Sequence, residues 1–447
     1  MSMTFSIKKT CLASLIFVLI NSQAAIAVIS INGSLEAKNQ SGVHEGEVYR
    51  NYLKADLELG QNLNNTVFKV RLRAEDDTIR PEDTGDNYLR DDITGPQRIY
   101  IHEAFITHDI YFEQFIDSIN LKMGRIIYTW GNADEMKPVD ILNPQDYSNL
   151  YFTELQDRKI GVFSASMSVY FTESFFIEGV VIPEFRSSEI ASSTFITKEV
   201  REIQENTSMY KLNDAVSPEE KNSENSYAGR IGITVFDIDM HVNYFYGYDH
   251  LPVNEMALTG TIPAISVTPE YKQIQMFGLD FQRALLRGIT VRGEGAYYDR
   301  GKYFSYESDY ITSNLMSGGD GTIEKDYAQY TVGFDDHDFI FDDLYLNLQF
   351  HQKIIMDYEN TISQEKYINM VLWNIKYFML NKKLRLSTKG AYDTGDESLY
   401  ANAEFMIKFT ESFEFMIGGW VIEGDEDTDI GQFDPYDMVY VAGKLTF

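Results

Sequence analysis

The chain has little cysteine, proline and positive charge, and no long hydrophobic run. Its 447 residues include one Cys and 10 Pro, and 38 Lys+Arg stand against 68 Asp+Glu. The resulting net charge of -30 argues against a surface that holds nucleic acid by neutralising phosphates. At 44% hydrophobic and 14% aromatic residues, the chain is also too apolar for a disordered acidic tail. These absences leave a folded acidic protein.

Residues 1–27 have the features of a cleaved secretory signal. Two lysines at 8–9 precede the apolar stretch 11–20, and residues 25–27 read Ala-Ile-Ala, which fits the small-x-small cleavage rule. The apolar stretch is too short to span a bilayer as a helix. The only cysteine, Cys11, lies in this segment, so the exported chain could form no disulfide, thiolate metal site or covalent haem attachment of its own.

The remaining sequence favours strands. No stretch after residue 27 approaches 18 apolar residues, so no transmembrane helix is expected. The 30 Tyr and 29 Phe are typical of strand-rich chains. A mean hydropathy of -0.27 does not exclude a membrane protein, because a transmembrane barrel alternates lipid-facing and lumen-facing residues. Export and a strand-rich composition together predict a closed barrel in the outer membrane of a Gram-negative cell.

Period-2 alternation occurs in segments of about ten residues, the length of a transmembrane strand. In 53–59, Leu and Ala alternate with Lys, Asp and Glu, and in 344–351 Leu and Phe alternate with polar residues. The expected fold is therefore all-β, a transmembrane antiparallel β-barrel of about 18 strands, or 16–20 if a strand is merged or missed. The expected strands are 28–37, 49–60, 66–75, 98–108, 118–130, 158–169, 174–182, 226–236, 237–247, 271–283, 286–298, 326–336, 342–353, 366–378, 380–392, 397–408, 411–422 and 436–447.

The connections between these segments alternate in length. Those after even-numbered strands are short and those after odd-numbered strands are often long, which is the asymmetry between periplasmic turns and outer loops. A soluble sandwich or propeller, the alternative, lacks this alternation. We therefore expect a signal over 1–27 and a single barrel over 28–447. The expected long outer loops are 76–97, 131–157, 183–225, 248–270, 299–325 and 423–435.

The most distinctive stretch begins with GRIIYTWGNAD at residue 124 and continues with PVDILNPQD to residue 146. Asn143-Pro144 favours a turn, within which Asp140 and Asp146 can hydrogen-bond backbone amides, and Trp130 can anchor the base of the loop. Two interpretations remain open: a structural lock within an outer loop, or a constriction folded into the lumen. The candidate loop residues are Trp130, Gly131, Asp134, Asp140, Asn143, Pro144 and Asp146.

This stretch resembles the G-R/K-x-x-x-x-W-G … D-x-x-N-P-x-D loop of a large porin-like outer-membrane family, which is more distantly similar to the eighteen-stranded alginate export barrel. The motif covers about 24 residues, and the rest of the chain matches only in pattern. The resemblance implies a substrate-conducting barrel whose substrate varies among members. The chain departs from an alginate exporter in one respect, because a polyanion should need a strongly basic lumen and this chain is acidic.

Polar positions of the expected strands predict a lumen of mixed charge. Much of the acid instead falls in loops, in 75–92 and 423–437, where it forms either a solvated surface or a rim that binds cations bridging lipopolysaccharide phosphates. Basic strand positions indicate anionic or zwitterionic solutes, since a local field rather than net charge decides selectivity. The candidate pore-lining residues are Lys69, Arg71, Arg73, Glu178, Arg230, Asp239, Arg292, Glu294, Lys383, Arg385 and Lys389.

Motifs that imitate enzymes or metal sites carry little weight. Residues 425–431 imitate a calcium loop but lack its twelfth-position Glu, and the D-T-G triplets at 83–85 and 393–395 lie in expected loops. None of the 7 His lies in a recognisable nucleophile motif. We therefore expect no catalytic residue, metal or cofactor.

The sequence favours an outer-membrane channel for diffusion or export of small to medium polar solutes. Its expected partners are outer-membrane lipid, lipopolysaccharide and the solute, with no nucleic acid. Homo-oligomerisation and an export partner stay open. One alternative is a barrel that sheathes or docks an export or electron-transfer partner, and another is an enzyme at the barrel rim.

Overall fold

The computed structural model describes residues 29–43, 46–80, 96–190, 195–218, 225–260, 262, 264–285, 288–338 and 341–447. The expected signal at 1–27, the triplet at 83–85 and most of the expected loop 76–97 lie outside this set.

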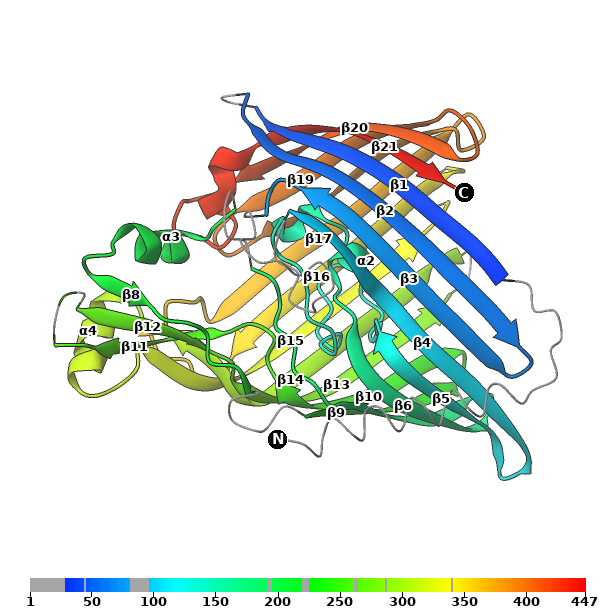
Figure 1. The fold of residues 1–447 in the computed structure, drawn as a ribbon, viewed down its shortest axis with the longest axis horizontal. Coiled ribbons are helices and arrows are strands. Elements are labelled where there is room, and N and C mark those ends of the chain that lie inside the picture. Colours follow the sequence, from blue (N-terminus) through cyan, green and yellow to red (C-terminus); the bar gives the residue numbers. More distant parts are fainter. Residues whose placement is uncertain are drawn as a thin grey trace.

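Eighteen antiparallel strands form one closed sheet (Figure 1), which confirms the expected fold class. Barrel strands adjacent in the chain pair with one another, and β1 pairs with β21 to close the ring. Each of the expected segments overlaps one barrel strand. The strands are β1 Ile29–Gly42, β2 Val48–Leu63, β3 Thr66–Asp77, β4 Gln97–Gln114, β5 Ile116–Ile126, β6 Val162–Thr172, β7 Phe175–Ile182, β9 Ser226–Val235, β10 Ile238–Tyr248, β13 Gln273–Ala284, β14 Thr290–Ser305, β15 Thr322–Asp336, β16 Leu344–Ile355, β17 Tyr367–Met379, β18 Leu384–Asp393, β19 Leu399–Lys408, β20 Phe413–Glu423 and β21 Met438–Thr446.

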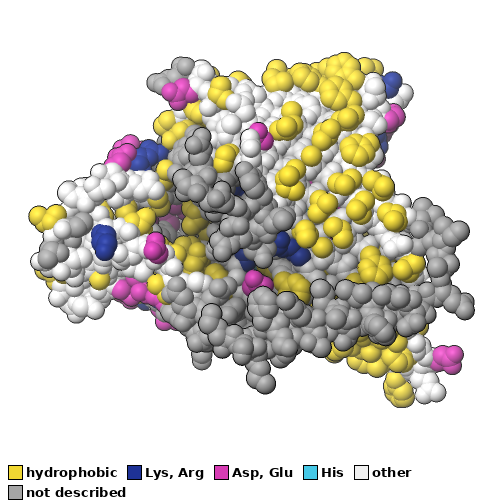
Figure 2. Space-filling model, in the orientation of Figure 1, with side chains coloured by type: hydrophobic (Ala, Val, Ile, Leu, Met, Phe, Trp, Pro, Cys, Tyr) yellow, Lys and Arg dark blue, Asp and Glu magenta, His cyan; other side chains and the backbone are white. Residues whose placement is uncertain are grey.

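The two faces of the barrel wall differ in polarity. Outward side chains such as Ile31 and Leu53 are apolar and exposed, whereas inward side chains such as Lys54 and Asp56 are polar and buried. Figure 2 shows apolar side chains gathered over the outer wall that β1–β4 form. This is the arrangement of a barrel that meets lipid outside and polar groups inside.

Short turns join the strands at one end of the barrel and longer connections join them at the other. Between β9 and β10, Phe236 and Asp237 both have positive φ, at 53° and 60°, as a two-residue hairpin turn requires. Several strand boundaries differ from expectation: β1, β4 and β14 extend beyond their expected ends to Gly42, Gln114 and Ser305. β5 ends at Ile126 rather than at residue 130, because the chain turns into the barrel there, and β18 begins at Leu384.

The longer connections carry their own structure at the left of Figure 1. β11 Val253–Leu258 pairs antiparallel with β12 Ile265–Glu270, which pairs parallel with β8 Tyr210–Leu212. The helices α3 Lys198–Glu205 and α4 Ser308–Met316 join this small sheet, and their side chains share an apolar cluster with β11 and β12. Among the described residues, no helix is long and apolar enough to cross a membrane.

Candidate functional site

Residues 127–161, which connect β5 to β6 and are named the inward segment here, lie inside the barrel. Opposite walls contact them: Arg73 of β3 binds Asp157, whereas Lys389 of β18 binds Glu154. On a third side, Tyr298 of β14 donates its hydroxyl to Pro138 O at 2.6 Å. A segment can reach all of these walls only from the lumen. The segment that contains the motif therefore folds into the lumen, as the second of the two interpretations expected.

Gly131 lets the segment approach the wall at β14. Its φ is +78°, and a Cβ at this position would lie 2.2 Å from Glu294 Oε2. With only hydrogen there, Asn132 and Ala133 donate their backbone N–H groups to Glu294 Oε2 at 2.6 and 2.9 Å. Val139 donates its N–H to Glu294 Oε1 at 3.3 Å. One carboxylate of the wall thus satisfies three backbone donors that would otherwise be buried without partners.

Asn143 ties the entry of the inward segment to its exit. Its Oδ1 accepts the Tyr128 N–H at 2.7 Å, and its Nδ2 donates to Ile126 O and Ile160 O, both at 2.9 Å. The carbonyl of the following Pro144 accepts the Ile160 N–H at 2.8 Å. Asn143-Pro144 therefore fixes both ends of the segment at the wall, beyond forming a turn.

A buried ion pair stiffens the middle of the inward segment. Lys159 Nζ contacts Asp140 Oδ2 at 2.5 Å and Tyr128 O at 2.8 Å. Burial lowers the pKa of Lys159, although Asp140 opposes this shift. Asp140 also accepts the backbone N–H of Trp130 at 3.4 Å, and Arg230 of β9 lies 5.2 Å from the buried Trp130 ring. Trp130 and Asp140 are thus internal supports of the segment.

On the β2–β4 side, charged groups fasten the far half of the segment to the wall. Arg73 donates to Asp56 Oδ1 and to Asp157 Oδ1, each at 2.8 Å, and Lys54 reaches Asp157 Oδ2 at 3.0 Å. Burial alone would raise the pKa of Asp157, but Lys54 and Arg73 bring it well below its usual range. Asp157 is therefore held as a carboxylate.

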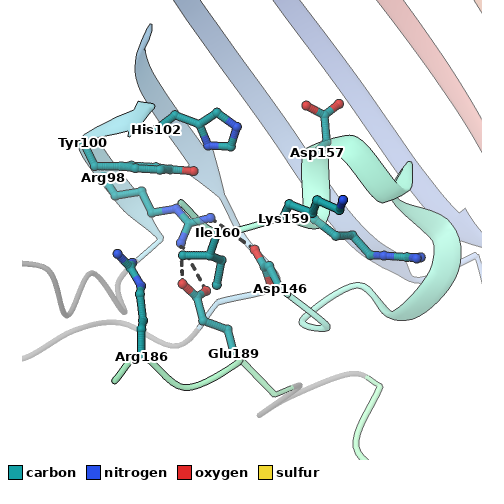
Figure 3. Close-up of a pocket in the computed structure, with 10 residues that line it drawn as sticks. Arg98, Tyr100, His102, Asp146, Asp157, Lys159, Ile160, Arg186 and Glu189 are labelled. Carbon is teal, nitrogen blue, oxygen red and sulfur yellow. Dashed lines mark hydrogen bonds and ion pairs between the residues drawn. The ribbon is translucent and has the colours of Figure 1, made fainter. Parts of the chain in front are cut away.

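A second group of charges completes this attachment, and Figure 3 shows its members Arg98, Asp146 and Glu189. Arg80 contacts both Asp146 and Glu189, and Arg98 of β4 reaches the same two carboxylates at 3.2 Å. The two guanidiniums outweigh burial and hold the pKa of Asp146 well below its usual range. The adjoining cavity, lined by Arg98, His102 and Asp146 among others, has only about 20 Å³, room for about one water. The clamp, defined as Lys54, Arg73, Arg80, Arg98, Asp146 and Asp157, closes this side of the lumen.

The opposite side of the lumen stays open. A cavity of about 270 Å³ separates the inward segment from β16–β20. At its edge Lys389 Nζ and Glu154 Oε1 lie 2.6 Å apart, with side chains 24% and 72% exposed. The lining residues are Ala133, Asp134, Glu135, Lys137, Glu154, Leu155, Gln156, Asn347, Gln349, Leu372, Trp373, Asn374, Lys389, Gly390, Tyr400 and Trp420.

Most basic residues that the sequence analysis assigned to the lumen lie against carboxylates. Arg292 contacts Asp335, and Lys389 contacts Glu154 as described above. The other pairs are Lys69–Glu58 at 3.0 Å, Arg71–Asp56 at 2.9 Å, Arg73–Asp56 at 2.8 Å, Arg230–Glu178 at 2.9 Å and Arg385–Glu404 at 2.6 Å. This pairing leaves little net positive field from these side chains.

Two assigned residues lie away from this arrangement. Asp239, at the short-turn end of β10, accepts a hydrogen bond from Thr234 at 2.7 Å. Lys383 lies in the turn between β17 and β18 and is exposed, so its placement on a strand was wrong. Its alternation with Leu384 and Arg385 continues past the end of the strand, which is why the pattern misled.

Sequence reasoning missed several residues of the site. Lys54 and Arg98 occupied polar positions in expected strands, a signal that could have found them. Arg80 and Glu189 lie in connections without periodicity, and only the folded chain brings them to Asp146. The described part of the chain contains no group of three or more His, Cys, Asp or Glu residues placed to hold a metal ion.

Several solved structures have a similar fold. OccD3 (OpdP) of Pseudomonas aeruginosa aligns over 94% of this chain and 91% of its own, at 7% identity and a TM-score of 0.50. OccAB1 of Acinetobacter baumannii aligns over 94% and 96%, at 8% identity and a TM-score of 0.49. The outer membrane channel DcaP of the same organism aligns over 94% and 97%, at 8% identity and 0.44.

At such identities the likeness to OccD3 concerns the fold alone, an outer-membrane type of barrel. No curated protein matches the chain. Residues 16–395, most of the chain, match the family described as "Protein of unknown function (DUF1302)", and the protein is therefore a member of the DUF1302 family.

Proposed function

We propose that the protein is a porin-like channel of the Gram-negative outer membrane, through which small to medium polar solutes pass by diffusion or export. The observation that carries this proposal is a closed barrel whose lumen is narrowed by the inward segment and keeps, at one side, a cavity lined by charged, polar and apolar side chains. The apolar outer wall supports a position in lipid. The proposal includes neither a cofactor nor an enzymatic activity.

The charge of the lumen refines the class of solute. Basic strand positions led us to expect anionic or zwitterionic solutes, but Arg71, Arg230 and Arg385 each lie within 3 Å of a carboxylate. A paired cation attracts a passing anion less than a free one does. The pairing therefore favours zwitterionic or uncharged polar solutes over simple anions.

The contacts that the inward segment makes across the lumen favour a channel over a barrel that sheathes a partner. A barrel that encloses an electron-transfer or export partner needs a wide bore, whereas here the inward segment contacts β3, β14 and β18 across the lumen. A partner docked outside the barrel remains compatible with the channel, as does a homo-oligomer.

Single-cysteine variants can test whether the cavity is the conducting path. The chain's one cysteine, Cys11, lies in the expected signal, so the exported barrel offers a cysteine-free background. Gln156 is exposed and lines the cavity. In planar bilayers, Gln156→Cys should conduct in steps, and a bulky cationic thiosulfonate reagent should reduce its conductance by at least half.

Phe115→Cys is the matched control. Phe115 is 98% exposed in the turn between β4 and β5, so its modification should leave conductance unchanged. Correctly folded protein without ion-permeable steps would contradict the channel. If modification of Gln156→Cys leaves the conductance unchanged, the conducting path does not run through this cavity.

A further inference from the structure

We propose that the cavity between the inward segment and β16–β20 is a binding site for a small zwitterion, a solute that carries one ammonium and one carboxylate. This inference rests on the proposed channel function and names its class of solute. The cavity holds about 270 Å³, slightly below the range of about 300–1,000 Å³ typical of ligand pockets. It therefore suits one small molecule better than an oligomer.

The inward segment supplies three carboxylates and one lysine to the cavity lining, and this lysine, Lys137, lies 3.7 Å from Asp140. Asp134 is 41% exposed at its side chain, and Gln349 Nε2 donates to its Oδ2 at 3.0 Å. Its Oδ1 has Arg292 at 3.5 Å, but that guanidinium is shared with Asp335. Glu135, by contrast, is held by Arg158 at 2.7 Å. Asp134 is thus the carboxylate best placed to receive an ammonium group.

The barrel wall supplies the positive side. Lys389 of β18 lines the cavity, and its carboxylate contact is Glu154, whose side chain is 72% exposed. An ion pair with so exposed a partner contributes little, so an incoming carboxylate can replace Glu154. Lys376 lies two residues beyond the cavity-lining Asn374 on β17, and the ring of Tyr345 lies 5.5 Å from its Nζ. Both lysines belong to the barrel wall, whereas Asp134 belongs to the inward segment.

The β16 part of the barrel wall contributes a buried amide donor that lacks a well-formed hydrogen bond. Asn347 lines the cavity and is 2% exposed, and its Nδ2 interacts with the Tyr345 hydroxyl but makes no hydrogen bond of good geometry within the described part of the chain. A buried donor without a well-formed hydrogen bond costs free energy that a ligand oxygen can recover. This observation points to a solute with an acceptor oxygen, such as a carboxylate, beside β16.

A carboxylate of the inward segment and an ammonium of the barrel wall, both lining one cavity, favour a dipolar solute. A singly charged molecule satisfies one of these groups and brings no partner to the other, whereas a zwitterion pairs with both. Tyr400 and Trp420 add a largely apolar surface, with ring centroids 6.1 Å apart, against which a short alkyl group can pack.

Isosteric probes test this inference. L-leucine carries both charged groups, 4-methylpentanoate lacks the ammonium, and 3-methylbutylamine lacks the carboxylate. Titration calorimetry on full-length protein in detergent micelles should show L-leucine binding at least tenfold tighter than either analogue. Binding measured in this way needs no conduction, so its failure and a failure of the channel are distinguishable.

Each variant that neutralises one charge of the cavity should remove the advantage of L-leucine over one of the two analogues. Asp134→Asn should bring L-leucine to the level of 4-methylpentanoate, and Lys389→Gln should bring it to the level of 3-methylbutylamine. Lys408→Gln, which removes a lysine paired with the exposed Glu411 outside the cavity, is the control and should keep the preference. L-leucine that binds no better than the analogues, or a preference that survives both cavity variants, would overturn the inference.

Discussion

Two lysine–carboxylate pairs of the inward segment have nearly the same length and opposite surroundings. Lys159 and Asp140 lie 2.5 Å apart with side chains 1% and 2% exposed. Lys389 and Glu154 lie 2.6 Å apart with side chains 24% and 72% exposed. Distance does not distinguish them, but burial does. Breaking a buried pair leaves a charge without solvent, whereas water compensates the members of an exposed pair. The first pair therefore holds the segment, and the second is free to exchange partners.

The largest expected effect comes from breaking the buried pair. Asp140→Asn leaves the Lys159 ammonium without its carboxylate, and the free energy of unfolding should fall by about 3–5 kcal/mol. Urea unfolding in micelles, followed by tryptophan fluorescence, measures this change. Glu154→Gln is the matched variant of the exposed pair and should cost less than about 1 kcal/mol. Equal losses in the two variants would show that burial does not separate the pairs.

A smaller effect is expected where the segment meets β14. Gly131→Ala forces a Cβ toward Glu294 at a φ of +78°, and the strain should cost about 1–3 kcal/mol. Single-channel current should also become noisier as the segment loosens. Gly179→Ala on β7 is the control, because a Cβ there meets nothing within 4 Å. A quiet and stable Gly131→Ala channel would contradict the close approach at Glu294.

The clamp side and the cavity side of the lumen should also differ in their response to acid. The pKa of Asp146 lies well below its usual range, so its ion pairs contribute fully above the unfolded value of about 3.9 and are lost only as pH falls through the lower folded value. Between pH 7 and pH 5 the clamp should therefore contribute constant stability. Urea unfolding across this range checks this expectation for the clamp side.

The cavity side should titrate at higher pH. Burial raises the pKa of Asp134, although Arg292 opposes the shift, so its negative charge is lost above the usual range for Asp. Asp335, Lys137 and Lys376 also act on this carboxylate. Reversal potentials in a salt gradient should show cation preference declining before the clamp weakens. Asp134→Asn should remove this decline. If the variant keeps the pH profile of the unmodified channel, a group other than Asp134 causes the decline in cation preference.

The strands were predictable because their signal is local. Alternation within ten residues is enough to place Lys54 inward and Leu53 outward, whatever the rest of the chain does. The same locality caused the errors. Tyr128 and Trp130 continue the alternation of Ile126, so nothing in the pattern shows that the chain has left the wall. Lys383 likewise continues the alternation of β18 into a turn.

The site was predictable only in part. The motif drew attention to Gly131, Asp140 and Asn143, but their partners lie elsewhere in the chain. Glu294, which receives the N–H groups of residues 132, 133 and 139, is more than 150 residues away along the sequence. The exchangeable pair is equally non-local, since Lys389 and Glu154 are 235 residues apart. No periodicity encodes which strand will face which loop.

The seam between β1 and β21, from Ser34 opposite Thr446 to Gly42 opposite Met438, has a consequence for folding. Contacts between such distant residues form late, because closing a long loop costs entropy before pairing rewards it. The inward segment belongs to the early part of the chain, yet its partners on β14, β16 and β18 come later. The contacts that narrow the lumen therefore need strands from the later part of the chain, so the narrowed lumen is complete only after these strands have taken their places.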